Sequence, residues 1–188
     1  MIRNYFTLSL CVGIAFFMLG AACAGAESNE DTRARVPAFT LEDQYGVTHE
    51  YTFPRERVLL VTISARKGSR DMDPWLKALH EAYDGKIDFQ GIADLSGTPY
   101  MARKFVRAVI RNRSTRSVLC DWSGEVSQGF GADSAVANVL VVSPGGRIHH
   151  HAKGPMTDAS LNKVRAAIDH FLTGDATTHT NVTPLPPR

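Results

Sequence analysis

The sequence Val58-Leu59-Leu60-Val61-Thr62-Ile63-Ser64 is the stretch that decides the fold. A run this apolar and this rich in β-branched residues predicts a strand that is buried on both faces of a sheet. A helix is predicted soon after it, because Asp73-Pro74 is typical of a helix start and Gly85 of a helix end. The large apolar residues between these limits recur every four positions and predict the buried face of that helix: Trp75, Leu79 and Tyr83.

Strand and helix signals continue to alternate on either side of this strand. Before it, β-prone runs at 36–41 and 47–53 flank an Asp/Gly turn and predict a hairpin. After the first helix, the predicted order is strand 87–92, a helix from Thr98-Pro99, strand 117–120, short helix 125–130, strand 139–142, strand 147–152 and helix 157–174. A β-α-β start demands parallel strands with right-handed crossovers, whereas the last hairpin adds an antiparallel edge. The predicted fold class is therefore α/β, with a mixed central sheet, helices on both faces and an N-terminal β-hairpin.

The N-terminus has the features of an export signal. Residues 5–22 carry no charge, Arg3 precedes them, and Ala24-Gly25-Ala26 offers a site with small residues for cleavage. This order of features predicts a signal peptide over 1–26. The rest of the chain then divides into a polar leader at 27–35, a folded domain at 36–173 and a disordered tail at 174–188.

Two alternatives to cleavage after Ala26 stay open. About 18 apolar residues can just span a bilayer, so 5–22 could remain as an anchor, although Gly13 and Gly20 interrupt the run. The sequence before Cys23 resembles a bacterial lipobox, which predicts lipidation at that cysteine. We expect a periplasmic protein, with a lipid-anchored envelope protein as the alternative.

Charge and cysteine content restrict the function. The 188 residues carry 21 lysines and arginines against 19 acids, and this near balance argues against a nucleic-acid binder. Cleavage after residue 26 would remove two of the three cysteines, Cys11 and Cys23, and leave only Cys120. A mature chain with one cysteine has no intramolecular disulfide, even in a compartment that permits one.

Three segments resemble the peroxiredoxin and redoxin-like branch of the thioredoxin superfamily. Residues 36–46 (VPAFTLEDQYG) resemble its opening pattern P-x-F-x-L-x-D-x-x-G, and 58–64 with the loop and helix after it resemble its first central strand. Residues 139–148 (VLVVSPGGRI) resemble its closing hairpin. The likeness covers 36–173, implies a thioredoxin-like fold, and extends to periplasmic proteins of the YtfJ type.

The chain departs from this branch where active members carry their reactive cysteine. That cysteine lies in the loop after the first central strand, as C-x-x-C or T-x-x-C, but residues 64–74 (SARKGSRDMDP) contain none. If Ser69 takes the threonine position, Met72 takes the cysteine position, and a thioether forms no thiolate. The proline that usually precedes the penultimate strand is also missing, because Ala135-Val136-Ala137-Asn138 stands there.

These departures favour a non-enzymatic binding or structural role, without a cofactor. The resemblance implies that the degenerate loop is the binding surface, through Lys67, Ser69, Arg70, Asp71 and Met72, and we expect the partner to be another envelope protein. The competing hypothesis is a weak or divergent thiol oxidoreductase, or a peroxiredoxin-like antioxidant, that uses Cys120. Its neighbour Asp121 is expected to raise the pKa of that thiol and so disfavour the second hypothesis.

The tract His149-His150-His151 is a weak candidate for metal binding. Strand alternation places His149 and His151 on one face, but metal sites usually need three or four ligands. The alternative is a polar, solvent-facing edge strand.

A basic stripe follows the helix after Thr98, in which Arg103, Arg107 and Arg111 recur every four residues. Met101, Phe105 and Val109 form the opposite stripe and are expected to be the apolar, core-facing side. The arginines then face outward, either as a solvated surface or as a contact for anionic lipid or an acidic partner.

Overall fold

The computed structural model describes residues 34–174; the predicted signal peptide, its cleavage site and residues 175–188 of the predicted tail lie outside this range, whereas Gly174 is the last residue of the final helix. It confirms the predicted α/β class, with a five-stranded mixed sheet and a separate two-stranded hairpin. The hairpin pairs β1 (Phe39–Glu42) with β2 (Thr48–Tyr51) in antiparallel register. Backbone pairing of the domain begins at Ala34 and Arg35, two residues before the predicted boundary, where Ala34 O accepts a bond from Ile148 N.

The central sheet has the strand order β5-β4-β3-β6-β7. Its members are β3 (Leu59–Ser64), β4 (Asp88–Asp94), β5 (Val118–Asp121), β6 (Asn138–Val142) and β7 (Ile148–Lys153). The first three run parallel, whereas β6 pairs antiparallel with β3 and β7 antiparallel with β6. The predicted strand therefore lies at the centre, where its residues from Leu59 to Ile63 are all buried.

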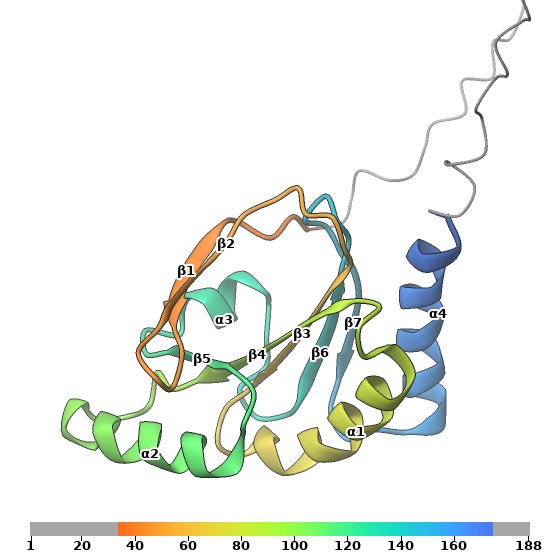
Figure 1. Ribbon diagram of the computed structural model, residues 1–188. Helices are drawn as coiled ribbons and strands as arrows, with labels where there is room; N and C mark the ends of the chain where they lie inside the picture. The colour runs from red at the N-terminus through yellow and green to blue at the C-terminus, as the bar shows by residue number, and fades with distance from the viewer. Residues whose placement is uncertain (1–33, 175–188) are drawn as a thin grey trace, which may run out of the picture. The chain divides into compact units, whose positions relative to one another are not determined.

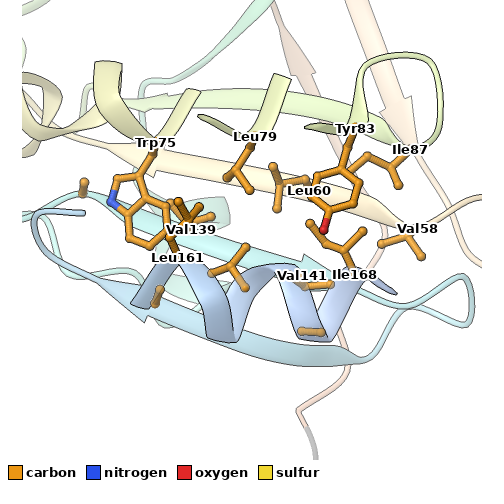
Figure 2. Packing of buried hydrophobic residues seen from close by; sticks show 14 of the residues in the cluster. Val58, Leu60, Trp75, Leu79, Tyr83, Ile87, Val139, Val141, Leu161 and Ile168 are labelled. Carbon is orange, nitrogen blue, oxygen red and sulfur yellow. The ribbon is translucent and has the colours of Figure 1, made fainter. Parts of the chain in front are cut away.

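Alternate residues of β3 point into different cores. Leu60 lies in a cluster with Trp75, Leu79 and Tyr83 of α1 (Met72–Tyr83) and with buried residues of α4 (Asp158–Gly174). Figure 2 shows these two helices closing over the sheet around Leu60 and Val141. The other cluster, with Leu59, Val61 and Ile63, is covered by the hairpin and by α3 (Glu125–Gly129). In Figure 1, α1 and α4 lie on the side of the sheet away from the hairpin and α3.

The start of α1 differs from the sequence prediction. A short 3₁₀ turn, η1 (Gly68–Asp71), leads into the helix, so Asp71 is the N-cap residue and Asp73 lies inside the first turn. Pro74 is tolerated there because the first turn of a helix has unpaired N–H groups anyway. The predicted end is correct, since Gly85 follows the last turn with a φ of 76°.

The helix α2 (Arg103–Arg113), which follows the 3₁₀ turn η2 (Tyr100–Ala102), has the opposite orientation to the predicted one. Met101 is 94% exposed and Phe105 is 71% exposed, so two of the three residues of the expected core-facing stripe face solvent, whereas Val109 is half-buried. The arginines face the protein instead: Arg107 pairs with Glu42, and Arg111 Nε donates to Gln44 O at 3.0 Å. The reason is local, because this edge of the domain offers a carboxylate and a carbonyl oxygen, which bind guanidinium groups and not apolar ones.

None of the helices within residues 34–174 is long and apolar enough to cross a membrane.

Candidate functional site

The candidate site is the loop 65–71 between the carboxyl end of β3 and the start of α1. Ser69 fixes its shape, because Ser69 N donates to Ala65 O at 3.1 Å and Ser69 Oγ donates to Arg66 O at 3.0 Å. Lys67 and Arg70 are exposed, and neither forms an ion pair with any residue that the structure describes. The loop therefore presents uncompensated positive charge to solvent.

Gly68, in the middle of the loop, packs directly on the backbone before β6. A Cβ atom at this position would lie 2.2 Å from the carbonyl carbon and oxygen of Val136 and 2.7 Å from Ala137 N. Only glycine allows so close an approach of two backbones. The loop therefore packs closely on residues 135–138, the segment in which the resemblance predicts a proline and the chain has none.

Asn138 holds that segment in place of the missing proline. Its side chain is fully buried, and Nδ2 donates to the carbonyl oxygens of Asp133, Val136 and Ile63 at 2.8, 3.0 and 3.2 Å. Its Oδ1 accepts from Asp133 N at 2.9 Å. The sequence prediction missed this residue, although an asparagine next to the apolar run 139–142 was the available signal.

The five predicted loop residues do not share one surface. Lys67 and Arg70 are exposed, Ser69 and Asp71 are half-buried, and Met72 is only 6% exposed. Met72, the first residue of α1, packs in the same buried cluster as Trp75 and Leu79. Its side chain is thus part of the core, and the solvent-facing part of the loop is the cationic one.

Cys120 lies on β5, two strands away from β3, and is 1% exposed. Burial raises the pKa of its thiol to about 11; Arg107 lowers that pKa by a smaller amount, and the carboxylates of Asp43 and Glu42 raise it slightly further. The expected cause was the neighbouring Asp121, but that carboxylate accepts bonds from Gly124 N and Ser127 N, both at 2.8 Å, at the start of α3. The raised pKa was predicted correctly but its cause was not.

The histidine tract does not alternate as expected, because a bulge interrupts the register of β6 and β7 between Val141 and Val142. His149 stacks on His170 of α4 with 5.1 Å between ring centroids, whereas His151 Nε2 lies 3.1 Å from Asn138 Oδ1. Burial, together with Lys153 and His150, lowers the pKa of His151 to about 4. Within residues 34–174 no group of three or more potential ligands could hold a metal ion.

A further polar cluster, formed by Asp43, His49 and Ser117, was missed by the sequence prediction. His49 Nε2 lies 3.0 Å from Asp43 Oδ2 and 3.4 Å from Ser117 Oγ, and Ser117 Oγ donates to Asp43 Oδ2 at 3.2 Å. A catalytic triad needs the carboxylate and the hydroxyl on different ring nitrogens, but here they share one. The cluster therefore anchors the hairpin to β5 and does not activate the serine.

Comparisons with known proteins identify the fold. The chain matches no family model and no curated protein. Among solved structures it is similar to the thioredoxin domain of a thiol-disulfide oxidoreductase from Bacteroides vulgatus, with 17% identity over 72% of this chain and 97% of that one, at a TM-score of 0.54. The chain has a thioredoxin-like fold.

Two other structures support the same conclusion. The exposed lipoprotein thioredoxin Etrx1 of Streptococcus pneumoniae is 13% identical over 68% of this chain and 97% of its own, at a TM-score of 0.56. A hypothetical protein from Sinorhizobium meliloti 1021 is 21% identical over 82% of this chain and 89% of its own, also at 0.56. Structural matches at identities this low show the thioredoxin-like fold alone, and the activity depends on the residues of the site.

The first prediction concerns the contact between Gly68 and Val136. Gly68→Ala places a methyl group inside the backbone of the neighbouring segment, so we expect a loss of about 1–3 kcal/mol in the free energy of unfolding. Gly97→Ala is the control, because a Cβ there meets nothing within 4 Å. Urea titration of both variants is the measurement, and equal midpoints would contradict the packing.

The second prediction concerns Asp43. Burial disfavours its charge, but the hydrogen bonds from His49, from Val47 and Tyr45 N–H and from Ser117 outweigh it and hold the pKa of Asp43 below 3.8. The stabilisation is therefore present above about pH 4 and lost as the pH falls through the lower, folded-state pKa. We expect Asp43→Asn to cost about 1–3 kcal/mol at pH 7 and clearly less at pH 2–3.

The exposed Glu81→Gln is the control for this pH dependence and should change stability by less than about 0.5 kcal/mol at either pH. Unfolding free energies measured at both pH values give the comparison. A cost for Asp43→Asn that stays the same at pH 2–3 would show that its charge is not involved.

Proposed function

We propose that this protein is an exported, non-enzymatic binding protein of the cell envelope, and that the cations of loop 65–71 contact an acidic segment of another envelope protein. The observation that carries the proposal is the loop itself. At the place where the resemblance predicts a reactive cysteine, the chain presents Lys67 and Arg70 without acidic partners among residues 34–174. Compared with active redoxin-like proteins, the loop thus lacks a thiol and exposes positive charge beside the position of the missing cysteine.

The rigidity of the loop favours binding. Gly68 lies against Val136, and Asn138 fixes that segment through bonds to three carbonyl oxygens. A loop whose backbone is already ordered loses less conformational entropy when a partner binds. The arrangement supports a preformed contact surface, in which Lys67 and Arg70 supply the charge.

The environment of Cys120 argues against the thiol oxidoreductase hypothesis. A pKa of about 11 leaves about one thiol in ten thousand ionised at pH 7, and the thiolate is the attacking species. The side chain is also buried on β5, two strands away from β3, the strand that leads into the loop. Its environment is typical of a cysteine that packs as a small apolar residue.

Three lines of support favour an envelope location. The sequence predicts a signal peptide over 1–26, with lipidation at Cys23 as the alternative that would tether the domain to a membrane. A protein of similar fold, Etrx1, is described as an exposed lipoprotein. The sequence likeness to periplasmic YtfJ-type proteins agrees with the same location.

The third prediction is that Cys120 is unreactive in the folded protein. In the chain from residue 27, which lacks Cys11 and Cys23, Ellman's reagent should modify less than about one tenth of the Cys120 thiol over an hour in native buffer and all of it in denaturant, because burial prevents ionisation and access. The matched control is Lys67→Cys in a Cys120→Ser background, which places a thiol on the exposed loop and should react within minutes. Peroxide consumption or insulin reduction that is lost in Cys120→Ser would overturn the non-enzymatic proposal.

The fourth prediction tests the loop as the contact surface. The tagged chain should retain an acidic envelope protein from periplasmic extract, and Lys67→Glu with Arg70→Glu should reduce the retained amount about tenfold or more, because two attractive charges become repulsive. Lys163→Glu reverses the charge of an exposed cation on α4, away from the loop, and as the control it should retain the partner normally. Equal retention by the loop variant and the control would exclude the loop.

A further inference from the structure

The outward side of α2 combines exposed apolar and cationic side chains. Tyr100 is 81% exposed, and it lies beside Met101 and Phe105, which also face solvent. Lys104 is exposed between the two apolar residues of the helix. We refer to Tyr100, Met101, Lys104 and Phe105 as the α2 surface. Large apolar side chains gathered in this way usually mark an interaction site.

The orientation of α2 is enforced from its inner side. The guanidinium groups of Arg103 and Arg107 lie 5.0 and 5.7 Å from the centre of the Trp122 ring, and Arg107 also pairs with Glu42. These contacts, with the bond from Arg111 to Gln44 O, hold the helix by its basic stripe. Phe105 is therefore directed away from the protein by several contacts acting together.

The segment that carries the α2 surface contains basic residues and no acidic ones. Residues 95–120 contain no acid, whereas six of the 21 lysines and arginines of the chain lie between 103 and 116, so acids outnumber bases in the rest of the chain. Arg107 and Arg116 pair with Glu42 and Asp84. Within residues 34–174, Lys104 and Arg113 have no carboxylate partner. The surface is thus complementary to an anionic partner.

We propose that the α2 surface docks on an anionic lipid bilayer. Met101 and Phe105 would enter the boundary between headgroups and acyl chains, Tyr100 would lie at the headgroup level, and Lys104 and Arg113 would contact the phosphates. A helix that presents single protruding apolar side chains among cations matches a bilayer, which is deformable and negatively charged. This inference does not depend on the binding role proposed for loop 65–71.

Other occupants fit the α2 surface less well. A second copy of the chain in a twofold dimer would bring the same patch against itself and place Lys104 opposite like charges. An acidic protein would need pockets for Tyr100, Met101 and Phe105, whereas a bilayer accepts them without a preformed shape. Both occupants are outcomes that the experiment distinguishes.

The experiment is cosedimentation of the chain from residue 27 with sucrose-loaded vesicles. This chain contains the whole folded unit and both hydrophobic clusters but leaves out the apolar segment 5–22, which would itself bind lipid. Vesicles of phosphatidylglycerol and phosphatidylcholine in a 1:1 ratio are compared with pure phosphatidylcholine. We expect binding to the first alone, and a decrease as salt rises from 50 to 500 mM.

The variants separate apolar from charge contributions. Met101→Ser with Phe105→Ser should weaken binding about tenfold or more, because both side chains leave the acyl boundary. Lys104→Gln should weaken it about fivefold. The controls are Val47→Ser, at an exposed apolar residue of the hairpin turn, and Lys163→Gln on α4; both should bind like the unchanged chain.

Three results would overturn the proposal. One is binding no stronger to anionic than to neutral vesicles, and another is binding that the α2 variants do not change. The third is evidence for a different occupant when vesicle binding is absent. That evidence would be a dimer in sedimentation velocity, or capture of a soluble acidic protein, which Met101→Ser with Phe105→Ser abolishes. All the substituted residues are exposed, so thermal unfolding should confirm that each variant remains folded.

Discussion

The burial of β3 on both faces is the constraint on which the rest of the domain depends. Leu60 points into the core under α1 and α4, whereas Leu59 and Val61 point into the core under the hairpin and α3. Both layers of the domain therefore rest on alternate residues of one strand. Loop 65–71 follows directly from the carboxyl end of the same strand, so the position of the candidate site depends on the strand that organises the core.

The loop after β3 has an ordered backbone although it contains no thiol. Gly68 packs on Val136, and Asn138 holds the segment that carries Val136, so the loop stays ordered although no cysteine is present in it. The remaining cysteine of the described chain, Cys120, is buried on β5. The ordered backbone and the exposed charge of Lys67 and Arg70 support binding as the proposed role, with α2 as a separate surface for lipid.

The sequence prediction succeeded where a pattern of residues could be buried in only one way. Trp75, Leu79 and Tyr83 repeat at helical spacing next to an apolar strand, and the only way to remove them from water is to pack them on it. The prediction was wrong for Phe105. The helix has an apolar stripe and a basic stripe of similar length, and the residues that bind the arginines lie elsewhere in the chain. Glu42 and Trp122 are far from Arg107 in sequence, and no local pattern indicates that they meet it.

The sequence by itself determined the order of strands and helices and the lack of a cysteine in the loop after β3, because these follow from local periodicity or from residue identity. The thioredoxin-like class was implied by the resemblance of three segments to the redoxin-like branch. The tertiary structure alone decided the faces. It turned Met101 and Phe105 outward, it placed Met72 in the core, and a bulge separated His149 from His151. The physical reason is that a face is chosen by competition between partners from distant segments, and those partners come together only when the chain has folded.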